Sequence, residues 1–215
     1  MGLIINREIE DGCFLGLWEI TEDYETLFRM TYLNGDDIRR LNSFKSFHRK
    51  IESLSVRALL QQMTRPDARI VYNKQSHKPF LDDRSFNISV SHSHKYTSIL
   101  LGKNKLVGVD LEYMTHKIEK VAHKFIHKQD VITSNLLTRR KQLYIHWCAK
   151  EALFKICDKI DINFHEDLII KPFDVNTEGC IIGVVQNDSR YEEFKMHYQI
   201  VNNYVWVYCM KQVPG

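Results

Sequence analysis

Two carboxylates in the apolar segment 106–114 (LVGVDLEYM) are the first candidates for chemistry. Asp110 and Glu112 are two residues apart, so on a strand both side chains would lie on one face of a sheet. Neighbouring carboxylates repel each other, and a buried pair has to be neutralised by a proton or a cation. The pattern therefore indicates either the polar face of an edge strand or a cation site.

A third carboxylate lies in the segment 143–157 (LYIHWCAKEALFKIC), which has the periodicity of an amphipathic helix. The apolar stripe that we expect to face the core consists of Ala149, Ala152, Leu153 and Ile156. The opposite face is expected to hold Tyr144, Trp147, Glu151 and Lys155. Such a face is often solvated, with a Glu–Lys surface pair, but one that carries both Tyr and Trp is expected to pack against another segment. If Glu151 meets Asp110 and Glu112, the three supply the oxygen ligands that Mg²⁺ takes together with phosphate oxygens.

The segment 86–96 (FNISVSHSHKY) offers contacts for an anion. Strand alternation puts Ser91 on one face and His92 on the other, and His92, near the strand end, could donate to a phosphate. His92 and His94 could instead bind zinc, although no cysteine pair or further spaced histidine completes such a site. Lys78 precedes a proline in a predicted loop, where its ammonium could meet an anion or face solvent. His123 and His127, four residues apart on a predicted helix, are expected to be surface residues.

The elements that would position these residues follow from periodicity and turn residues. Predicted helices cover 22–30, 38–63, 117–130 and 139–157, and predicted strands cover 13–20, 68–73, 86–92, 96–102, 106–112, 166–173, 180–186, 192–201 and 204–210. Residues 74–85 read as a loop. Hairpin turns are predicted at 103–105 and at Asn202–Asn203, since Asn tolerates positive φ.

Helices followed by strands occur twice along the chain, which predicts an α+β protein with two similar α/β halves. We expect each half to be a small antiparallel sheet packed on a long helix, with boundaries at 1–112 and 113–215. Asp110 and Glu112 would then end the first half and Glu151 would lie in the second, so these carboxylates would meet only if the halves pack face to face.

The amino-acid composition narrows the class of protein further. The 215 residues carry a formal net charge of +3 and include five cysteines, with no C-x-x-C spacing. The small basic excess fits an anionic ligand or an acidic partner rather than nucleic acid. The cysteine pattern, the lack of a secretory signal and the lack of a long apolar segment predict a cytoplasmic protein that does not insert into membranes.

Four segments in order, KPFL, FNISVSHS, VGVDLE and WCAKEALFK, extend over residues 78–155. Together they resemble the 4'-phosphopantetheinyl transferase superfamily, in its single-chain, pseudo-dimeric form that activates carrier proteins. The resemblance implies halves related by pseudo-twofold symmetry, an active site in the cleft between them, and a monomer. It also implies transfer of the 4'-phosphopantetheine arm of coenzyme A to a serine of an apo acyl or peptidyl carrier protein, with release of 3',5'-ADP.

The resemblance assigns roles to particular residues. Asp110, Glu112 and Glu151 match the Mg²⁺ ligands, with Mn²⁺ as a substitute ion, and Glu151 is the candidate to accept the serine proton. Lys155 matches the lysine that contacts the phosphates of coenzyme A. Further coenzyme A contacts are expected from Lys78, Ser91 and His92, while the 3'-phosphate should meet basic residues among Arg39, Arg40, Lys45, Arg49 and Lys50.

Two departures and two alternatives complete the sequence analysis. His77 stands where the family often has Gly, and Cys148 stands where Ser or Thr is common; neither change removes a charged residue. A different Mg²⁺-dependent phosphoryl transferase would need a nucleotide motif such as G-x-x-x-x-G-K-[ST], which does not occur. A non-catalytic binding module would be expected to lack one of the three carboxylates, and none is missing.

Overall fold

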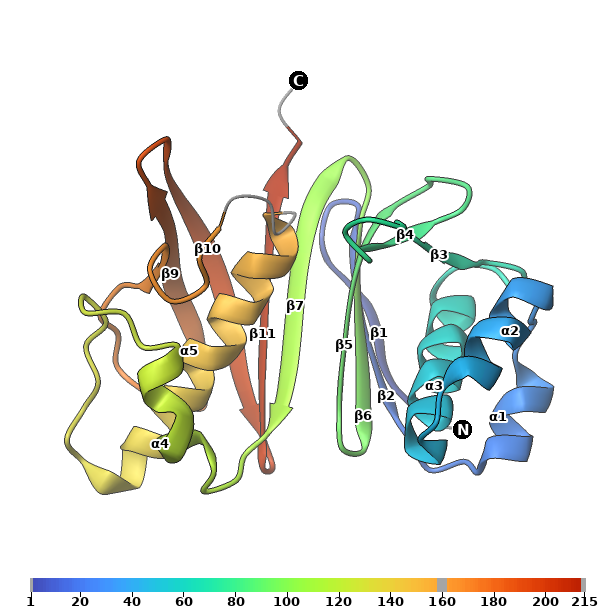
Figure 1. Cartoon of the computed structure of the whole chain (residues 1–215), viewed down its shortest axis with the longest axis horizontal. Coiled ribbons are helices and arrows are strands. Elements are labelled where there is room, and N and C mark those ends of the chain that lie inside the picture. The colour runs from blue at the N-terminus through green and yellow to red at the C-terminus, as the bar shows by residue number, and fades with distance from the viewer. Residues whose placement is uncertain (1, 158–161, 214–215) are drawn as a thin grey trace. The chain divides into compact units, whose positions relative to one another are not determined.

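The computed structural model describes residues 2–157 and 162–213, and it is an α+β protein, as expected. Its residues divide into two compact units, 1–104 and 105–215. Each unit contains an antiparallel sheet and one long helix (Figure 1). In the part of the chain that the structure describes, no helix is both long enough and apolar enough to cross a bilayer.

The N-terminal unit has a four-stranded sheet in the order β1-β2-β6-β5 and a small β3-β4 ribbon. Its strands are β1 (Leu3–Glu10), β2 (Cys13–Glu19), β3 (Ile70–Tyr72), β4 (Pro79–Leu81), β5 (Asn87–Ser93) and β6 (Tyr96–Gly102). Its helices are α1 (Tyr24–Met30), α2 (Gly35–Ser43) and α3 (Phe47–Met63). Apolar residues of α3, among them Leu54 and Leu59, pack with Trp18, Ile99 and Leu101 of the sheet to form its core.

Helix α2 begins where the sequence provides a cap. The Asn34 side chain accepts a hydrogen bond from the Asp37 amide, and the Asp37 carboxylate accepts one from the Asn34 amide. This capping box satisfies two backbone donors that a helix start leaves open. The predicted single helix 38–63 is wrong, because the extended backbone at Phe44 ends α2 and Ser46 precedes a new helix.

The C-terminal unit has a five-stranded sheet in the order β7-β11-β10-β9-β8. Its strands are β7 (Lys105–Tyr113), β8 (Leu168–Ile170), β9 (Glu178–Asn187), β10 (Arg190–Val201) and β11 (Tyr204–Gln212). Its helices are α4 (Ile118–Val121), a 3₁₀ turn (Ala122–Lys124) and α5 (Leu136–Ile156). The predicted hairpin turn at Asn202–Asn203 is confirmed, with Asn202 at φ 53°.

Helix α5 packs closely on β7, and this packing sets the distance between side chains on the two elements. A Cβ atom at Gly108 would lie 2.2 Å from the backbone oxygen of Ala152, so only glycine permits this approach. The predicted apolar stripe of α5 is fully buried, with Ala149, Ala152 and Leu153 at 0% exposure. The short distance between strand and helix brings the neighbouring side chains of both elements together.

The predicted hairpin at 103–105 is wrong. Strand β6 pairs with β2 on one side and with β5 on the other, so neither of its edges is open to β7. Strand β7 instead pairs with β11, and the chain passes from one sheet to the other at Asn104, which has φ 55°. Asp110 and Glu112 thus belong to the same unit as Glu151, and the expectation that two halves supply these carboxylates is wrong.

Other differences lie where local contacts override periodicity. Residues 125–130 are not helical, because the Asp130 carboxylate accepts hydrogen bonds from the amides of His127 and Ile170 and holds this segment as a loop. Strand β1 was not predicted, because its charged and half-exposed sequence LIINREIE does not alternate clearly between apolar and polar residues. The predicted loop 74–85 contains the short strand β4.

Candidate active site

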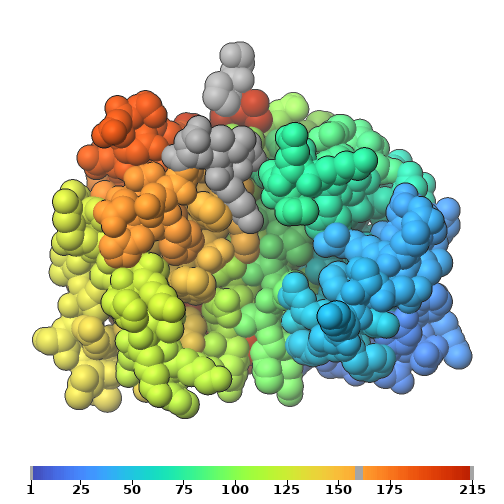
Figure 2. Space-filling view, in the orientation of Figure 1, coloured from blue at the N-terminus to red at the C-terminus, as the bar shows by residue number. Residues whose placement is uncertain are grey.

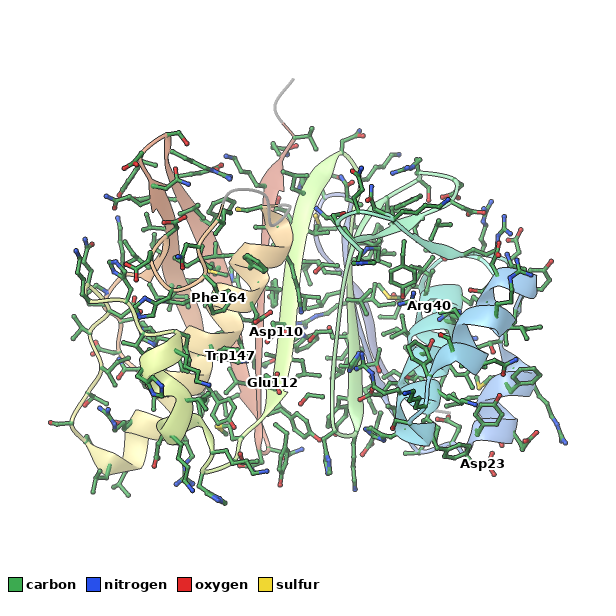
Figure 3. The ribbon with its side chains drawn as sticks, viewed as in Figure 1. Asp23, Arg40, Asp110, Glu112, Trp147 and Phe164 are labelled. Atoms are coloured by element: carbon green, nitrogen blue, oxygen red, sulfur yellow. The ribbon has the colours of Figure 1, made fainter. Side chains whose placement is uncertain are left out.

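Asp110 and Glu112 lie on the face of β7 that is turned toward α5. Both share this face with Gly108, whose Cα approaches the Ala152 backbone of the helix. Figure 3 shows both carboxylates on β7 beside α5. Asp110 is buried and only 4% exposed, whereas Glu112 is partly exposed. The edge-strand interpretation therefore accounts for Glu112 better than for Asp110.

Lys155, on the last turn of α5, reaches across to β7. Its ammonium donates to the Asp110 carboxylate, with 2.7 Å between Nζ and Oδ1, and to the backbone oxygen of Val109 at 2.9 Å. Glu151 is partly buried one helical turn earlier on α5. These two contacts place the Lys155 side chain against Asp110.

The thiol of Cys148 reports on the field around these carboxylates. Burial raises its pKa well above the usual value, and the charges of Asp110 and Glu112 raise it further. The charges of both carboxylates therefore influence the same residue of α5, Cys148. Glu151 lies three residues further along this helix. Cys148 remains a neutral thiol here, which leaves the three carboxylates as the anionic groups of this part of α5 and β7.

The donor set of Asp110, Glu112 and Glu151 consists only of carboxylate oxygens, which suits Mg²⁺ or Mn²⁺ and not zinc. Among residues 2–157 and 162–213, no three His, Cys, Asp or Glu side chains converge closely enough to form a metal site by themselves. Asp110 is held by Lys155 instead. The chemistry of these donors fits a hard divalent cation.

The aromatic face of α5 is packed, not solvated. The Trp147 ring lies 5.2 Å from Phe125 and 5.6 Å from Phe164, measured between centroids. Tyr144 is buried, and its hydroxyl accepts a hydrogen bond from the amide of Thr115, just beyond β7. Contacts on this side of the helix hold its rotation, and with it the direction of Glu151.

A second charged cluster lies in the N-terminal unit, between α3 and the end of β5. The Nδ1 atom of His92 lies 3.3 Å from Glu52, and its Nε2 atom lies 3.2 Å from the Arg49 guanidinium. Arg49 also contacts Glu52 at 3.2 Å. Because arginine can only donate, His92 accepts at Nε2 and donates to Glu52 from Nδ1.

Glu52 is the residue of this cluster that sequence reasoning missed. Burial by itself would raise its pKa, but the hydrogen bond from His92, together with the positive charge of Arg49, holds the pKa below its usual value. The signal was available, since Glu52 follows Arg49 by three residues on a predicted helix. Glu52 contacts both His92 and Arg49 and so restricts the positions of their side chains.

The other predicted anion-binding residues occupy several positions of the N-terminal unit. Ser91 is buried on the opposite face of β5 from His92. Lys50 is partly exposed on α3, and Lys78 is partly exposed directly before β4. Of the remaining basic candidates, Arg39 pairs with Asp36, Lys45 is exposed, and Arg40 places its guanidinium 3.6 Å over the Tyr72 ring.

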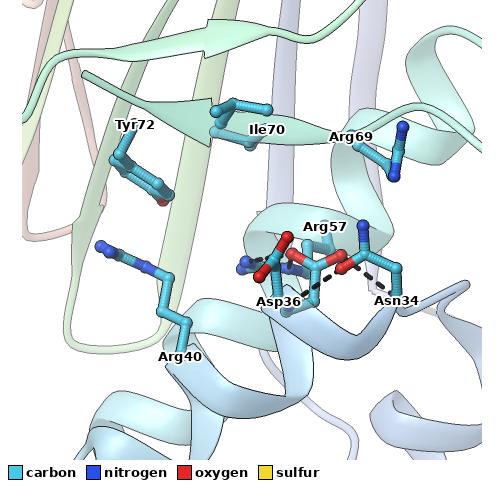
Figure 4. A pocket seen from close by; sticks show the side chains of 9 residues that line it. Asn34, Asp36, Arg40, Arg57, Arg69, Ile70 and Tyr72 are labelled. Atoms are coloured by element: carbon cyan, nitrogen blue, oxygen red, sulfur yellow. Dashed lines mark hydrogen bonds and ion pairs between the residues drawn. The ribbon is translucent and has the colours of Figure 1, made fainter. Parts of the chain in front are cut away.

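Arg40 and Tyr72 line a pocket of about 330 Å³ in the N-terminal unit (Figure 4). Its wall includes the buried ion pair between Arg57 and Asp37, with 2.7 Å between Nη2 and Oδ1, and also Arg69. Tyr72 and Arg57 are functional candidates that the sequence did not single out. His127, predicted at the surface, is buried in the C-terminal unit, because its backbone amide and ring hydrogen-bond within the 127–130 turn.

Comparisons with known proteins agree with the sequence motifs. Residues 106–209, which hold β7, α5 and β11, match the model of the 4'-phosphopantetheinyl transferase superfamily. The chain is also 28% identical over 128 residues to the 4'-phosphopantetheinyl transferase gsp of Aneurinibacillus migulanus. That alignment covers 57% of this chain and 53% of the relative, so it spans about half of the relative's length.

Proposed function

Because residues 106–209 belong to the 4'-phosphopantetheinyl transferase superfamily, we propose that this protein moves the 4'-phosphopantetheine arm of coenzyme A onto a serine of an apo acyl or peptidyl carrier protein. The observation that carries the proposal is the pairing of β7 with α5. It brings Asp110 and Glu112 against the helix that bears Glu151 and Lys155.

The proposed reaction is a displacement at phosphorus. The serine oxygen forms a bond to the phosphorus next to the pantetheine arm, and the bond from that phosphorus to the bridging oxygen of the pyrophosphate breaks. The leaving group is 3',5'-ADP. Glu151 accepts the serine proton, which raises the reactivity of a hydroxyl that is otherwise a weak nucleophile. Lys155 stabilises negative charge on the leaving phosphate.

Asp110, Glu112 and Glu151 would hold Mg²⁺, or Mn²⁺ in its place. When bound, such an ion neutralises the pyrophosphate oxygens and the carboxylates together. Lys155 partly neutralises Asp110 in the arrangement described. The chain's own contribution is to hold three carboxylates on rigid elements, two on a strand and one on a helix.

Coenzyme A is proposed to contact Lys78, Ser91 and His92, with Arg49 and Lys50 close to its 3'-phosphate. The contact between Arg49 and His92 supports a shared role for this pair. The pocket that holds Arg40 and Tyr72 is the competing site for the 3'-phosphate. A comparison of coenzyme A with 3'-dephospho-coenzyme A distinguishes the two. Only the variant that lacks the true ligand, Arg49→Ala or Arg40→Ala, should lose the preference for the 3'-phosphate.

The activity is tested by the mass of an apo carrier protein after incubation with this chain, coenzyme A and Mg²⁺. We expect each carrier to gain one phosphopantetheine group, and no gain in EDTA or with Asp110→Ala. Transfer at an undiminished rate in EDTA would overturn the metal assignment. No gain on any acyl or peptidyl carrier would overturn the proposed function itself. A panel of both carrier types also identifies the acceptor.

A further inference from the structure

Two cysteines lie close together where the last turn of α5 packs on the sheet of the C-terminal unit. Cys209 on β11 is the cross-strand partner of Gly108 on β7, and paired residues share a face, so Cys209 is turned toward α5. A Cβ atom at Gly108 would lie 3.2 Å from the Cβ atom of Ile156. Cys157 directly follows Ile156 and ends the helix. Both cysteines therefore belong to one packed cluster of this unit.

Electrostatic coupling between the two thiols agrees with this placement. Burial raises the pKa of the Cys209 thiol, and negative charge on Cys157 raises it further. The third cysteine of this core, Cys148, is influenced instead by the carboxylates of Asp110 and Glu112. Because Cys209 is 0% exposed and stays protonated, it is not the sulfur that meets a reagent from solution first.

Cys157 differs from Cys209 in its exposure and in its neighbour. Its side chain is half-buried, and its sulfur accepts a hydrogen bond from the Arg190 guanidinium, with 3.5 Å between Nη2 and Sγ. A guanidinium beside a sulfur stabilises the thiolate, which is the form that reacts with electrophiles. Arg190 begins β10 directly after the turn between β9 and β10, and this turn lies at the surface (Figure 2). Cys157 is thus the sulfur of the pair that a small solute can reach.

We propose that Cys157 and Cys209 form a thiol oxidation site that reacts with a hydroperoxide and closes to a disulfide. The Cys157 thiolate attacks an oxygen of the hydroperoxide, so an S–O bond forms and the O–O bond breaks. The departing oxygen takes a proton from solvent and leaves as water or an alcohol. The peroxide is thereby reduced, and Cys157 is oxidised to a sulfenic acid.

The second step joins the two sulfurs. The Cys209 sulfur attacks the sulfur of the Cys157 sulfenic acid, the S–S bond forms, and the S–O bond breaks. The hydroxide that leaves takes the proton of the Cys209 thiol and is released as water. Burial protects Cys209 until this step, since the sulfur it attacks is its neighbour in the cluster.

Ordinary core packing explains Cys209 but not the arrangement at Cys157. A buried cysteine commonly serves as a small apolar residue, and this is sufficient for Cys148. A sulfur that is accessible, contacts an arginine and has a second sulfur behind it is typical of thiols that oxidise reversibly. Zinc is a poorer explanation, because no three His, Cys, Asp or Glu side chains converge within residues 2–157 and 162–213.

A disulfide at this place would act on Lys155. The two sulfurs have to come within about 2 Å of each other and the two Cα atoms within roughly 7 Å, so the end of α5 becomes fixed to β11. Lys155 lies two residues before Cys157, and its ammonium contacts Asp110 on β7. We expect this restraint to displace Lys155 and to lower kcat about tenfold or more. The effect on kcat rests on the proposed function, whereas the thiol chemistry does not.

The site is tested by treating the whole chain with hydrogen peroxide, blocking the remaining thiols and measuring masses. We expect a monomer that has lost two hydrogens, a cross-link between the peptides that hold Cys157 and Cys209, and reversal by dithiothreitol. Cys157→Ser should abolish the cross-link, and Cys209→Ala should leave a sulfenic acid at Cys157 that dimedone traps. Cys180→Ser is the matched control, because Cys180 is exposed on β9 and contacts His197. This variant should form the cross-link as wild type does.

Arg190→Gln tests why Cys157 reacts. It should form the same cross-link severalfold more slowly, and a rate equal to wild type would overturn the part assigned to the guanidinium. Absence of the Cys157–Cys209 cross-link from oxidised wild-type monomer, or absence of a dimedone adduct in Cys209→Ala, would overturn the oxidation site.

Transfer to an apo carrier is measured before and after oxidation. A loss of kcat that dithiothreitol reverses in wild type, and that Cys157→Ser does not show, supports the effect on Lys155. An unchanged kcat in fully cross-linked protein overturns that effect. If wild type transfers nothing even before oxidation, the proposed function fails, and the cross-link alone still decides whether the oxidation site exists.

Discussion

Lys155 and Asp110 form an ion pair across the gap between α5 and β7, with 2.7 Å between Nζ and Oδ1. The pair joins two residues with different proposed tasks, one toward phosphate and one toward a cation. If Asp110 binds a divalent ion as we propose, the ammonium of Lys155 would compete with that ion for the same carboxylate oxygen. Binding of the ion and release of the lysine would then be coupled.

Lys155→Ala is expected to bind Mg²⁺ more tightly than wild type while its turnover falls. The substitution removes the competing ammonium from Asp110 but also the positive charge proposed to face the leaving phosphate. Calorimetric titration with Mg²⁺, without coenzyme A, measures the first effect, and kcat measures the second, for which we expect a loss of about a hundredfold or more. Weaker Mg²⁺ binding in the variant would show that Lys155 helps the ion and does not compete with it.

Glu151→Gln is expected to abolish transfer and to leave the thermal midpoint unchanged within a few degrees. The amide keeps the size of the side chain, so no cavity forms, and loss of one negative charge relieves repulsion from Asp110 and Glu112. Transfer rate and thermal unfolding are measured on the same preparation. Turnover close to wild type would remove Glu151 from the reaction, and a collapsed midpoint would assign it to the fold.

Gly108→Ala is expected to destabilise the protein by about 1–3 kcal/mol and to lower activity. The added Cβ atom would lie 2.2 Å from the Ala152 oxygen, so α5 has to move away from β7. That movement separates Glu151 and Lys155 from Asp110. The matched control is Gly35→Ala in α2, where the nearest atom would be 3.5 Å away on a flexible arginine. If Gly108→Ala proved as stable and active as the Gly35→Ala control, the close packing of α5 on β7 would be refuted.

Stability is expected to fall as the pH drops below about 6.5, in part because of His146. Burial lowers the pKa of this histidine below its usual 6.5, although Asp130 and the Gln142 carbonyl favour its charged form. Below pH 6.5 the unfolded chain therefore binds a proton that the folded chain does not, and the free energy of unfolding decreases. For one histidine the slope reaches at most about 1.4 kcal/mol per pH unit.

Denaturant unfolding between pH 5 and 7 measures this slope. His146→Gln should flatten it, whereas substitution of the exposed His116 by Gln should leave it unchanged. Burial also lowers the pKa of His127, so a residual slope is expected in the first variant. Identical slopes for wild type and His146→Gln would contradict the assignment.

Local patterns predicted the elements around the site better than the pairing between them. The apolar stripe of α5 and the shared face of Asp110 and Glu112 follow from helical and strand periodicity, and both are present. The partner of β7 does not follow from local sequence. Lys103–Lys105 looks like a hairpin turn, but the competing β2 and β5 occupy both edges of β6. Strand pairing depends on residues far away in the sequence, and the periodicity of one segment does not reveal its partner strand.

Side-chain contacts between elements were also harder to predict than the residues themselves. His92 and Arg49 were both expected to face an anion, but their shared contact with Glu52 joins side chains of α3 and β5, which are far apart in the sequence. Tyr72 was missed because a single aromatic residue in a short strand carries no periodic signal, and its role depends on Arg40 from α2. Residues that belong to a sequence motif were predicted, whereas Glu52 and Tyr72, which stand out only through contacts between elements, were not.

The pairing of β7 with β11 sets the order in which the carboxylate site can assemble on the ribosome. Every residue pair in this ladder, from Tyr113–Tyr204 to Lys105–Gln212, joins positions 91 to 107 residues apart. The strand that bears Asp110 and Glu112 therefore leaves the exit tunnel long before its neighbour in the sheet has been translated. Contacts of such long range form slowly. The N-terminal unit can fold while translation continues, but the acidic strand gains its place in the sheet only after residues 204–212 have emerged.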